Sequence, residues 1–215
     1  MHEDPDRELF EAWRNGDPKA GDTLFTRHFD GLYGFFRRMA GDAVEDLLQV
    51  TCMKSVQSAS NFDGESTFRA YLFGIARHVL YDHLRVKYRR EKRHVDPTDM
   101  LERSLEDMGA SPLAAMAERE EVVLFARALR RIPIESQVLF ELHYWQKLPA
   151  PALARMLGVP EGTIRSRLRR AKDLLRERIT ELAASQEVLA STLSGFDTWA
   201  ERVRASPIWL NRPAD

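Results

Sequence analysis

The chain has 215 residues, of which 44% are hydrophobic, so it can form one large domain or two small ones. Its single cysteine, Cys52, excludes an intramolecular disulfide and a cysteine-rich zinc site. It contains neither a secretory segment nor a long apolar run, which predicts a cytoplasmic protein. The formal net charge of −1 conceals two basic segments, 77–93 and 161–178, separated by an acidic one, 96–121, and this suggests two polyanion-binding blocks joined by an acidic connector.

The first half of the chain contains three predicted helices. Asp17-Pro18 has the pattern of an N-cap followed by proline at the first helical position, and Gly41 ends this helix. Residues 42–45 have the spacing of a capping box and open a second helix, and after a loop over 61–66 a long helix covers about 67–93. The first two helices are expected to bury Leu24, Phe25, His28, Phe29, Leu32, Phe35, Phe36 and Met39, and Val44, Leu47, Leu48 and Thr51.

The second half begins with a predicted linker over 94–117, which contains Pro97, Gly109 and Pro112 and a short helix around 99–107. A second helical domain is expected over 118–180, with Pro133 breaking its first helix pair. The predicted fold class is therefore all-α. Two small helical domains, 1–93 and 118–180, are joined by the acidic linker, and residues 181–215 form a helical tail of unknown role.

Residues 138–178 read as a short helix, a tight turn and a longer helix. Gly158-Val159-Pro160 supplies the turn, with the proline suited to the first position of the next helix. In that helix, Ile164, Leu168, Ala171 and Leu175 form one apolar stripe, and Gly162, Arg165, Ser166, Arg169 and Arg170 face the other way. Small residues followed by arginines suit a helix end that enters the DNA major groove. An ordinary hairpin with a solvated basic face is the alternative, and the short first helix and glycine turn favour a helix-turn-helix.

The helix over 67–93 is a second candidate for nucleic-acid binding. Basic residues can follow a phosphate backbone, and aromatic rings such as Tyr71 and Tyr81 can stack on unpaired bases. The preceding loop, Phe62–Ser66, mixes a ring with short hydrogen-bonding side chains, as a pocket for an extruded base requires. Alternatively, each ring belongs to the core, and the basic run is a soluble helix end favoured by the helix dipole.

The acidic group of Asp42, Glu45 and Asp46 has three interpretations: helix capping, a metal site or a protein-docking face. A metal would need a further ligand from elsewhere, and the six histidines form no ligand pair four residues apart. The chain also contains no GxSxG motif and no phosphate-binding glycine loop. We therefore expect no metal, no cofactor and no catalytic centre.

Two stretches together resemble one family. Glu45-Asp46-Leu47-Leu48-Gln49, followed by Phe62-Asp63-Gly64 and the run from Phe68 to Arg85, resembles the sigma-2 domain of bacterial RNA polymerase sigma factors. Residues 129–133 together with 158–171 resemble their sigma-4 domain. The short linker and the lack of a middle domain make residues 8–178 similar to the extracytoplasmic-function (ECF) group of the sigma-70 family.

The resemblance implies a sigma factor, which catalyses nothing itself and gives core RNA polymerase its promoter specificity. The implied partners are the β′ and β subunits of core RNA polymerase and promoter DNA, with an anti-sigma factor as an optional further partner and no membrane insertion. Core-polymerase binding is assigned to Glu45, Asp46 and Gln49. Binding of −10 DNA is assigned to Phe62, Asp63, Gly64, Glu65, Ser66, Arg77, His78, Tyr81 and Arg85. Binding of −35 DNA is assigned to Arg165, Ser166, Arg167, Arg169 and Arg170.

The chain departs from the family pattern in several places, and its tail, 181–215, lies beyond the usual end. Val50-Thr51-Cys52 stands where Glu-Val-Phe is usual, His78 replaces a common asparagine, and residues 149–154 replace a polar start of the first helix of the turn motif. These departures bear on polymerase binding, −10 recognition and phosphate contacts, respectively.

Two other functions are compatible with the helix-turn-helix, and the tail has two alternative roles. A stand-alone helix-turn-helix regulator would use the same arginines without polymerase, and a recombinase or nuclease would need converging carboxylates or a Ser or Tyr nucleophile. The tail either packs on the chain's own domains or acts as a regulatory extension. A membrane-lying helix would need a cationic face, and the tail instead carries the acidic residues Glu187, Asp197 and Glu201.

Overall fold

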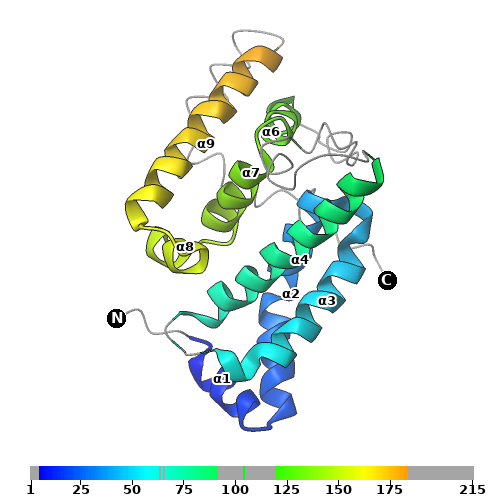
Figure 1. Ribbon diagram of the computed structural model, residues 1–215, viewed down its shortest axis with the longest axis vertical. Coiled ribbons are helices and arrows are strands. Elements are labelled where there is room, and N and C mark those ends of the chain that lie inside the picture. The colour runs from blue at the N-terminus through cyan, green and yellow to red at the C-terminus, as the bar shows by residue number, and fades with distance from the viewer. Residues whose placement is uncertain (1–4, 63, 65, 92–103, 105–119, 184–215) are drawn as a thin grey trace.

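The computed structural model describes the chain except for residues 1–4, 63, 65, 92–103, 105–119 and 184–215 (Figure 1). The part that it describes is helical and contains no strand, which confirms the predicted all-α class. The predicted short helix around 99–107 and the tail from 184 onward lie outside the described residues.

The N-terminal half packs three long helices side by side, with a short helix folded back on the first of them (Figure 1). Its elements are α1 (Arg7–Arg14), α2 (Pro18–Ala40), α3 (Val44–Ser58) and α4 (Phe68–Glu91), with 3₁₀ turns at Gly41–Ala43 and Ala59–Asn61. We call this half the N-terminal domain.

The C-terminal half is a second group of helices, which we call the C-terminal domain. Its elements are α6 (Glu120–Arg130), α7 (Ile134–Phe140), α8 (Ala150–Leu157) and α9 (Glu161–Leu182). Glu141–Trp145 continues α7 as a π-helical turn, η4. The predicted break at Pro133 is confirmed, since this extended residue stands between α6 and α7.

The predicted ends of α2 are confirmed. The Asp17 carboxylate accepts hydrogen bonds from the backbone N–H groups of Lys19 at 2.9 Å and Ala20 at 3.4 Å, and Pro18 is the first helical residue. These bonds satisfy donors that have no partner within the helix. At the other end, α2 stops at Ala40, and Gly41 turns the chain with φ 63°.

The predicted capping box before α3 is wrong. Residues 41–43 form a 3₁₀ turn, so that Ala43 becomes the N-cap and no side chain caps the helix. The Asp42 side chain is fully exposed, and its carboxylate lies 3.9 Å from the Arg37 guanidinium. The turn shifts the start of the helix by one residue, which removes the side-chain to backbone spacing that a capping box requires.

The predicted apolar face of α2 supplies much of the core of the N-terminal domain. Leu24, Leu32, Phe35, Phe36 and Met39 are buried, as are Phe68 and Phe73 of α4. The rings of Phe68 and Phe73 therefore belong to the core, as the alternative interpretation of the α4 rings expects.

One buried histidine in this face pairs with a buried carboxylate. His28 Nε2 lies 2.6 Å from Asp6 Oδ2, next to the start of α1, and both side chains are buried. Burial lowers the pKa of His28 despite the Asp6 carboxylate. The pair therefore ties the start of α1 to α2 within the apolar core.

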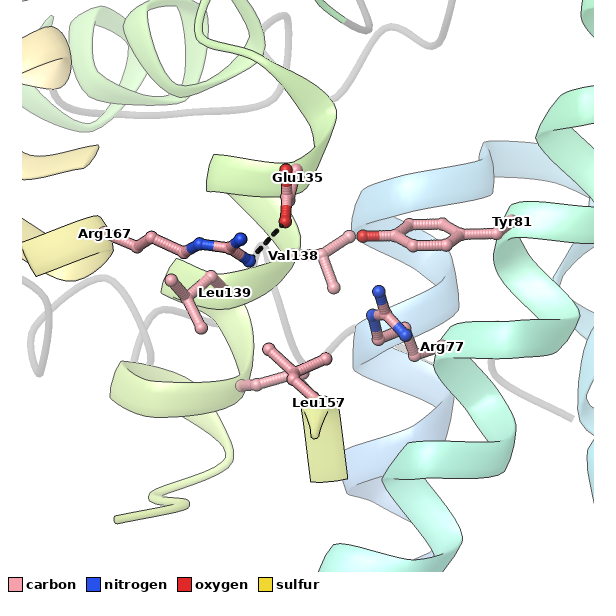
Figure 2. Close-up of a pocket in the computed structure, with 8 residues that line it drawn as sticks. Arg77, Tyr81, Glu135, Val138, Leu139, Leu157 and Arg167 are labelled. Atoms are coloured by element: carbon pink, nitrogen blue, oxygen red, sulfur yellow. Dashed lines mark hydrogen bonds and ion pairs between the residues drawn. The ribbon is translucent and has the colours of Figure 1, made fainter. Parts of the chain in front are cut away.

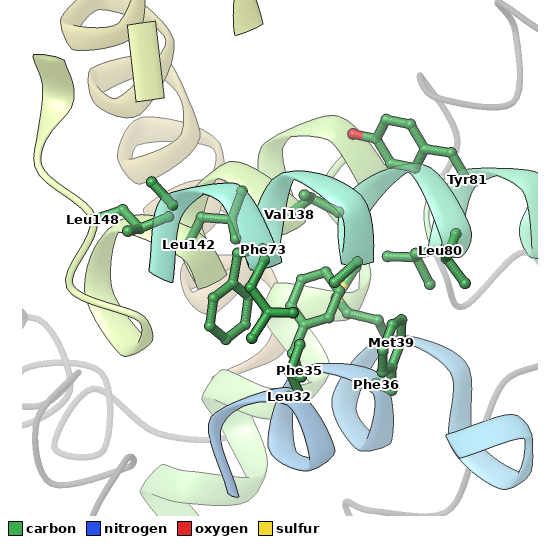
Figure 3. Packing of buried hydrophobic residues seen from close by; sticks show 14 of the residues in the cluster. Leu32, Phe35, Phe36, Met39, Phe73, Leu80, Tyr81, Val138, Leu142 and Leu148 are labelled. Atoms are coloured by element: carbon green, nitrogen blue, oxygen red, sulfur yellow. The ribbon is translucent and has the colours of Figure 1, made fainter. Parts of the chain in front are cut away.

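The two domains share a hydrophobic core, which the sequence did not predict. Leu32, Phe35 and Phe73 of the N-terminal domain belong to the same buried cluster as Val138 and Leu142 of the C-terminal domain (Figure 3). α8 also packs on α4. The surface of α4 that faces the C-terminal domain is therefore covered by protein.

Removal of the α2 cap provides a stability test. Asp17→Ala should lower the free energy of unfolding by about 1 kcal/mol, because two backbone donors lose their acceptor. Urea unfolding followed by circular dichroism measures this change. Asp22→Ala removes an exposed carboxylate from the same helix and should change stability by less than half as much; equal losses would contradict the capping role.

Candidate nucleic-acid interface

The turn between α8 and α9 is closed by a left-handed glycine. Gly158 has φ 64° and ψ 34°. Its N–H donates to the Arg155 carbonyl at 3.2 Å, and the Val159 N–H donates to the Ala154 carbonyl at 3.1 Å. This pair of bonds is a Schellman motif, which satisfies the last carbonyls of α8. The predicted turn is confirmed, with one correction: Pro160 is the N-cap of α9 and not its first helical residue.

α9 has the two faces that its sequence predicts. Ile164, Leu168, Ala171 and Leu175 are buried against the rest of the C-terminal domain. On the other side, Arg165, Ser166, Arg169 and Arg170 are exposed, and we call these four residues the arginine face. Gly162 is exposed beside them, so no bulky side chain covers the start of the helix.

The charges of the arginine face are available to a ligand. Arg165 Nε donates to Glu161 Oε1 at 2.9 Å, but the arginine side chain is 73% exposed, and such a pair adds at most about 1 kcal/mol. Arg169 and Arg170 make no ion pair with any other residue that the structure describes. A phosphate or a guanine edge can therefore bind these guanidinium groups without disrupting the fold.

Arg167 lies apart from the arginine face. Its Nη1 donates to Glu135 Oε1 of α7 at 2.8 Å. Figure 2 shows the side chain directed toward α7, at the edge of a pocket between the two domains. Of the five predicted −35 residues, four thus share one surface and the fifth is engaged by a neighbouring carboxylate.

The loop before α4 is described only in part, because Asp63 and Glu65 lie outside the described residues. Phe62 is buried, and its ring centroid lies 4.7 Å from that of Phe10 and 4.8 Å from that of Tyr71. Gly64 is exposed and has φ 76°. Ser66 is half-buried. The phenyl ring of Phe62 therefore anchors the start of this loop to the core.

The predicted −10 residues of α4 fall into two pairs. His78 is exposed, and Arg85 donates to Asp82 Oδ1 at 3.1 Å. Arg77 and Tyr81 instead face the C-terminal domain, with the Arg77 guanidinium 4.5 Å from the Tyr81 ring centroid (Figure 2). Burial raises the pKa of Tyr81 above its ordinary value. The rest of the pocket wall consists of Glu135, Val138, Leu139, Leu142, Leu157 and Arg167.

α3 presents a face that is acidic at one end and apolar at the other. Glu45, Asp46 and Gln49 are exposed, as predicted. At about 100° per residue, three exposed apolar side chains continue the same side of the helix. They are Val50, Met53 and Val56, which are 39%, 52% and 56% exposed. We did not expect this stripe from the sequence, although its three-residue spacing outside the buried set is visible there. We call these six residues the α3 face.

The α3 face and the rest of the described chain offer no metal centre. Within the resolved helices and loops, no three His, Cys, Asp or Glu side chains gather as metal ligands would. The α3 face has the chemistry of a protein-docking surface, because it combines carboxylates with exposed apolar side chains.

Comparison with known proteins identifies the family. The family described as Sigma-70 region 2 matches residues 24–90, and the one described as Sigma-70, region 4 matches residues 123–175. The ECF RNA polymerase sigma factor SigM of Mycobacterium tuberculosis is 34% identical over 175 residues, which cover 80% of this chain and 83% of SigM. The chain belongs to the ECF group of the sigma-70 family. Region 2 thus spans most of α2 through α4, and region 4 contains α7, α8 and most of α9.

Two further similarities agree with this assignment. The RNA polymerase sigma-H factor of Pseudomonas aeruginosa is 26% identical over 189 residues, which cover 85% of this chain and 97% of that factor. The structure of the sigma factor RpoE in complex with the anti-sigma factor NepR from Bartonella quintana has a TM-score of 0.58 and 24% identity. It covers 75% of this chain and 98% of RpoE, and it shows a shared fold.

Membership confirms the predicted function. As a sigma factor, this protein directs transcription initiation by RNA polymerase at promoter DNA, and sigma factors as a class are not enzymes. No helix among the described residues is long and apolar enough to cross a bilayer.

Two glycines of the helix-turn-helix provide a matched test. Gly158→Ala should destabilise the protein by about 1–2 kcal/mol, because an L-residue is strained in the left-handed conformation. Gly162→Ala should leave stability unchanged or raise it by up to about 1 kcal/mol, since this glycine lies in α9 and its Cβ would meet open space. Thermal unfolding followed by far-UV circular dichroism compares them, and equal losses would show that the turn does not need glycine.

Proposed function

We propose that the two domains of this sigma factor divide promoter recognition between them. The N-terminal domain, residues 1–93, binds core polymerase and the −10 element. The C-terminal domain, 118–180, binds the −35 element, and the acidic linker, 94–117, joins the two along the polymerase. The exposed arginine face behind the Gly158 turn is the observation that carries this proposal most directly.

The arginine face reads the −35 duplex in the major groove. α9 is buried along its apolar stripe, so its N-terminal end and the arginine face project from the C-terminal domain. Arg165, Arg169 and Arg170 can donate paired hydrogen bonds to guanine or bind phosphates, and Ser166 can bond to either. Arg167 contacts a phosphate once it leaves Glu135.

The loop from Phe62 to Ser66 and the basic part of α4 hold the −10 element. His78 is exposed and Arg85 is half-buried, and we expect both to contact the −10 strand. Arg77 and Tyr81 add a guanidinium and a ring that can engage phosphate and an unstacked base when they are uncovered. Asp63, Gly64, Glu65 and Ser66 contribute polar contacts to the captured base.

The α3 face binds the β′ subunit of core polymerase. Its carboxylates at Glu45 and Asp46 and the amide of Gln49 supply polar contacts, and Met53 and Val56 supply apolar area that is exposed in the free protein. A surface that combines the two is typical of protein–protein interfaces. We propose further that the protein acts in the cytoplasm, has no catalytic activity and, like RpoE of Bartonella quintana, has an anti-sigma partner.

Reconstituted transcription tests the function. Purified core RNA polymerase is incubated with and without this protein on a library of genomic fragments, and new transcript starts are mapped. Discrete starts that share two upstream elements support the proposal. A stand-alone regulator would instead bind an operator without polymerase and give no new starts.

Two substitutions test the division of labour. Arg165→Ala should weaken −35-dependent transcription by roughly tenfold or more, since a good base contact contributes about 1–3 kcal/mol of discrimination. Asp46→Ala should weaken binding to core polymerase and leave binding of the isolated −35 duplex unchanged. Each is compared with an exposed control of the same kind, Arg127→Ala or Asp22→Ala. Swapped outcomes would refute the assignment of the two surfaces.

A further inference from the structure

The N-terminal end of α9 carries a negative charge as well as its arginines. Glu161 is the first residue of α9 and stands one turn before Arg165. The other carboxylates of α9, at Asp173, Glu177 and Glu181, lie in its second half. A carboxylate beside the proposed DNA surface repels phosphates and by itself weakens binding. Its position therefore points to a role other than phosphate binding.

Glu161 holds Arg165 along one edge of the guanidinium group. Arg165 donates from Nε to Glu161 Oε1 at 2.9 Å, and its Nη2 donates to the same oxygen. The carboxylate is the less exposed partner, at 38% against 73% for the arginine. Two charge-assisted hydrogen bonds thus restrict the rotamers of the longer side chain from within its own helix.

This pairing leaves the base-reading edge of Arg165 free. The N–H donors of a guanidinium form a rigid planar fork. The bonds to Glu161 use the edge formed by Nε and Nη2, so the edge formed by Nη1 and Nη2 remains available. The parallel donors of that second edge match O6 and N7 of guanine. Arg165 can therefore keep its carboxylate and bind a guanine at the same time.

The other arginines near this end of α9 are held differently. Arg167 donates from Nη1 to Glu135 of α7, so the edge that would face a base is occupied. Arg169 and Arg170 are exposed and make no ion pair with any residue that the structure describes. Their unrestrained side chains suit phosphates, which do not require a fixed donor direction. Arg165 thus combines an oriented guanidinium with a free edge.

We propose that Glu161 is a positioning residue, which holds Arg165 in the orientation that reads one guanine of the −35 element. This inference rests on the proposed function and adds to it a determinant of base preference. Ordering a long side chain on binding weakens affinity, and an arginine that is held beforehand loses less freedom. Oriented donors that face a wrong base stay unpaired, whereas an unrestrained arginine can turn to a neighbouring phosphate.

Two simpler roles for Glu161 lead to different expectations. A carboxylate in the first turn of a helix stabilises it through the helix dipole, and loss of such a group lowers thermal stability without changing base preference. A carboxylate that only repels DNA would, on removal, strengthen binding to every sequence alike. The positioning role alone confines the effect to one base pair.

Transcription from a promoter library tests the positioning role. The full-length protein and core polymerase transcribe templates with a randomised −35 element, a −10 element taken from a mapped start and a transcribed barcode. Barcode counts give the preference at each position, and Arg165→Ala identifies the position that Arg165 reads. Glu161→Gln should reduce the preference for guanine there by about three- to tenfold, a part of what the full contact contributes. The preferences at the other positions should not change.

Matched variants separate the position of the carboxylate from its charge. Glu177→Gln removes an equal charge from an exposed site farther along α9 and should leave every preference unchanged. In the Arg165→Ala background, Glu161→Gln should have no further effect on base preference, because it acts through that arginine. Thermal unfolding of each variant reports a loss of helix stability separately.

The outcomes distinguish the positioning role from the function on which it rests. An unchanged guanine preference in Glu161→Gln would overturn the proposal, whether transcription rises on all sequences or falls together with thermal stability. A further loss of preference in the Arg165→Ala background, or a wild-type preference for another base at this position, would overturn it too. If Arg165→Ala changes no position, or the wild type gives no promoter-specific starts, the proposed −35 contact or the proposed function fails as well.

Discussion

The buried ion pair between Arg38 and Glu141 is the contact on which the arrangement of the two domains depends. It joins the end of α2 to the start of the π-helical turn η4, in a region with little solvent to replace either partner. Loss of one partner would leave a buried, uncompensated charge, which is more costly than the pair is stabilising. Gln146 and Arg69 extend the polar contact, and Leu32, Phe73, Val138 and Leu142 belong to the hydrophobic cluster that the two domains share (Figure 3).

The two proposed DNA-binding surfaces differ in how much of each the contact between the domains covers. The arginine face of α9 is exposed in the structure, whereas Arg77 and Tyr81 of α4 face α7. α6, α7 and α9 also form a second hydrophobic cluster around Phe125 and Phe140. Part of the C-terminal domain therefore packs in a cluster of its own, whereas Val138, Leu153 and Ile164 belong to the cluster that it shares with the N-terminal domain.

Much of the local structure could be predicted from particular residues. Asp17, Gly41, Pro133 and Gly158 mark helix ends where expected, because capping, proline geometry and left-handed glycine act over a few residues. Periodicity predicted the buried stripe of α9, and the arginines on the opposite side of the helix were therefore expected to be exposed. The predictions that were wrong also concerned single residues at helix ends. A 3₁₀ turn displaced Asp42 from the cap of α3, and Pro160 lies one position earlier than predicted. Spacing alone does not distinguish such neighbouring registers.

The sequence by itself determined the all-α class, the helix-turn-helix, the charge segregation and, through paired motifs, membership in the sigma-70 family. These features follow from short-range periodicity and from motifs of contiguous residues. Only the tertiary structure decided that Arg38 meets Glu141, 103 positions along the chain, and that Arg77 and Tyr81 are covered. Nothing in the local pattern distinguishes Arg38 from the neighbouring Arg37, which is near an exposed carboxylate. Their different environments arise because packing of the whole chain determines which side of α2 meets the C-terminal domain.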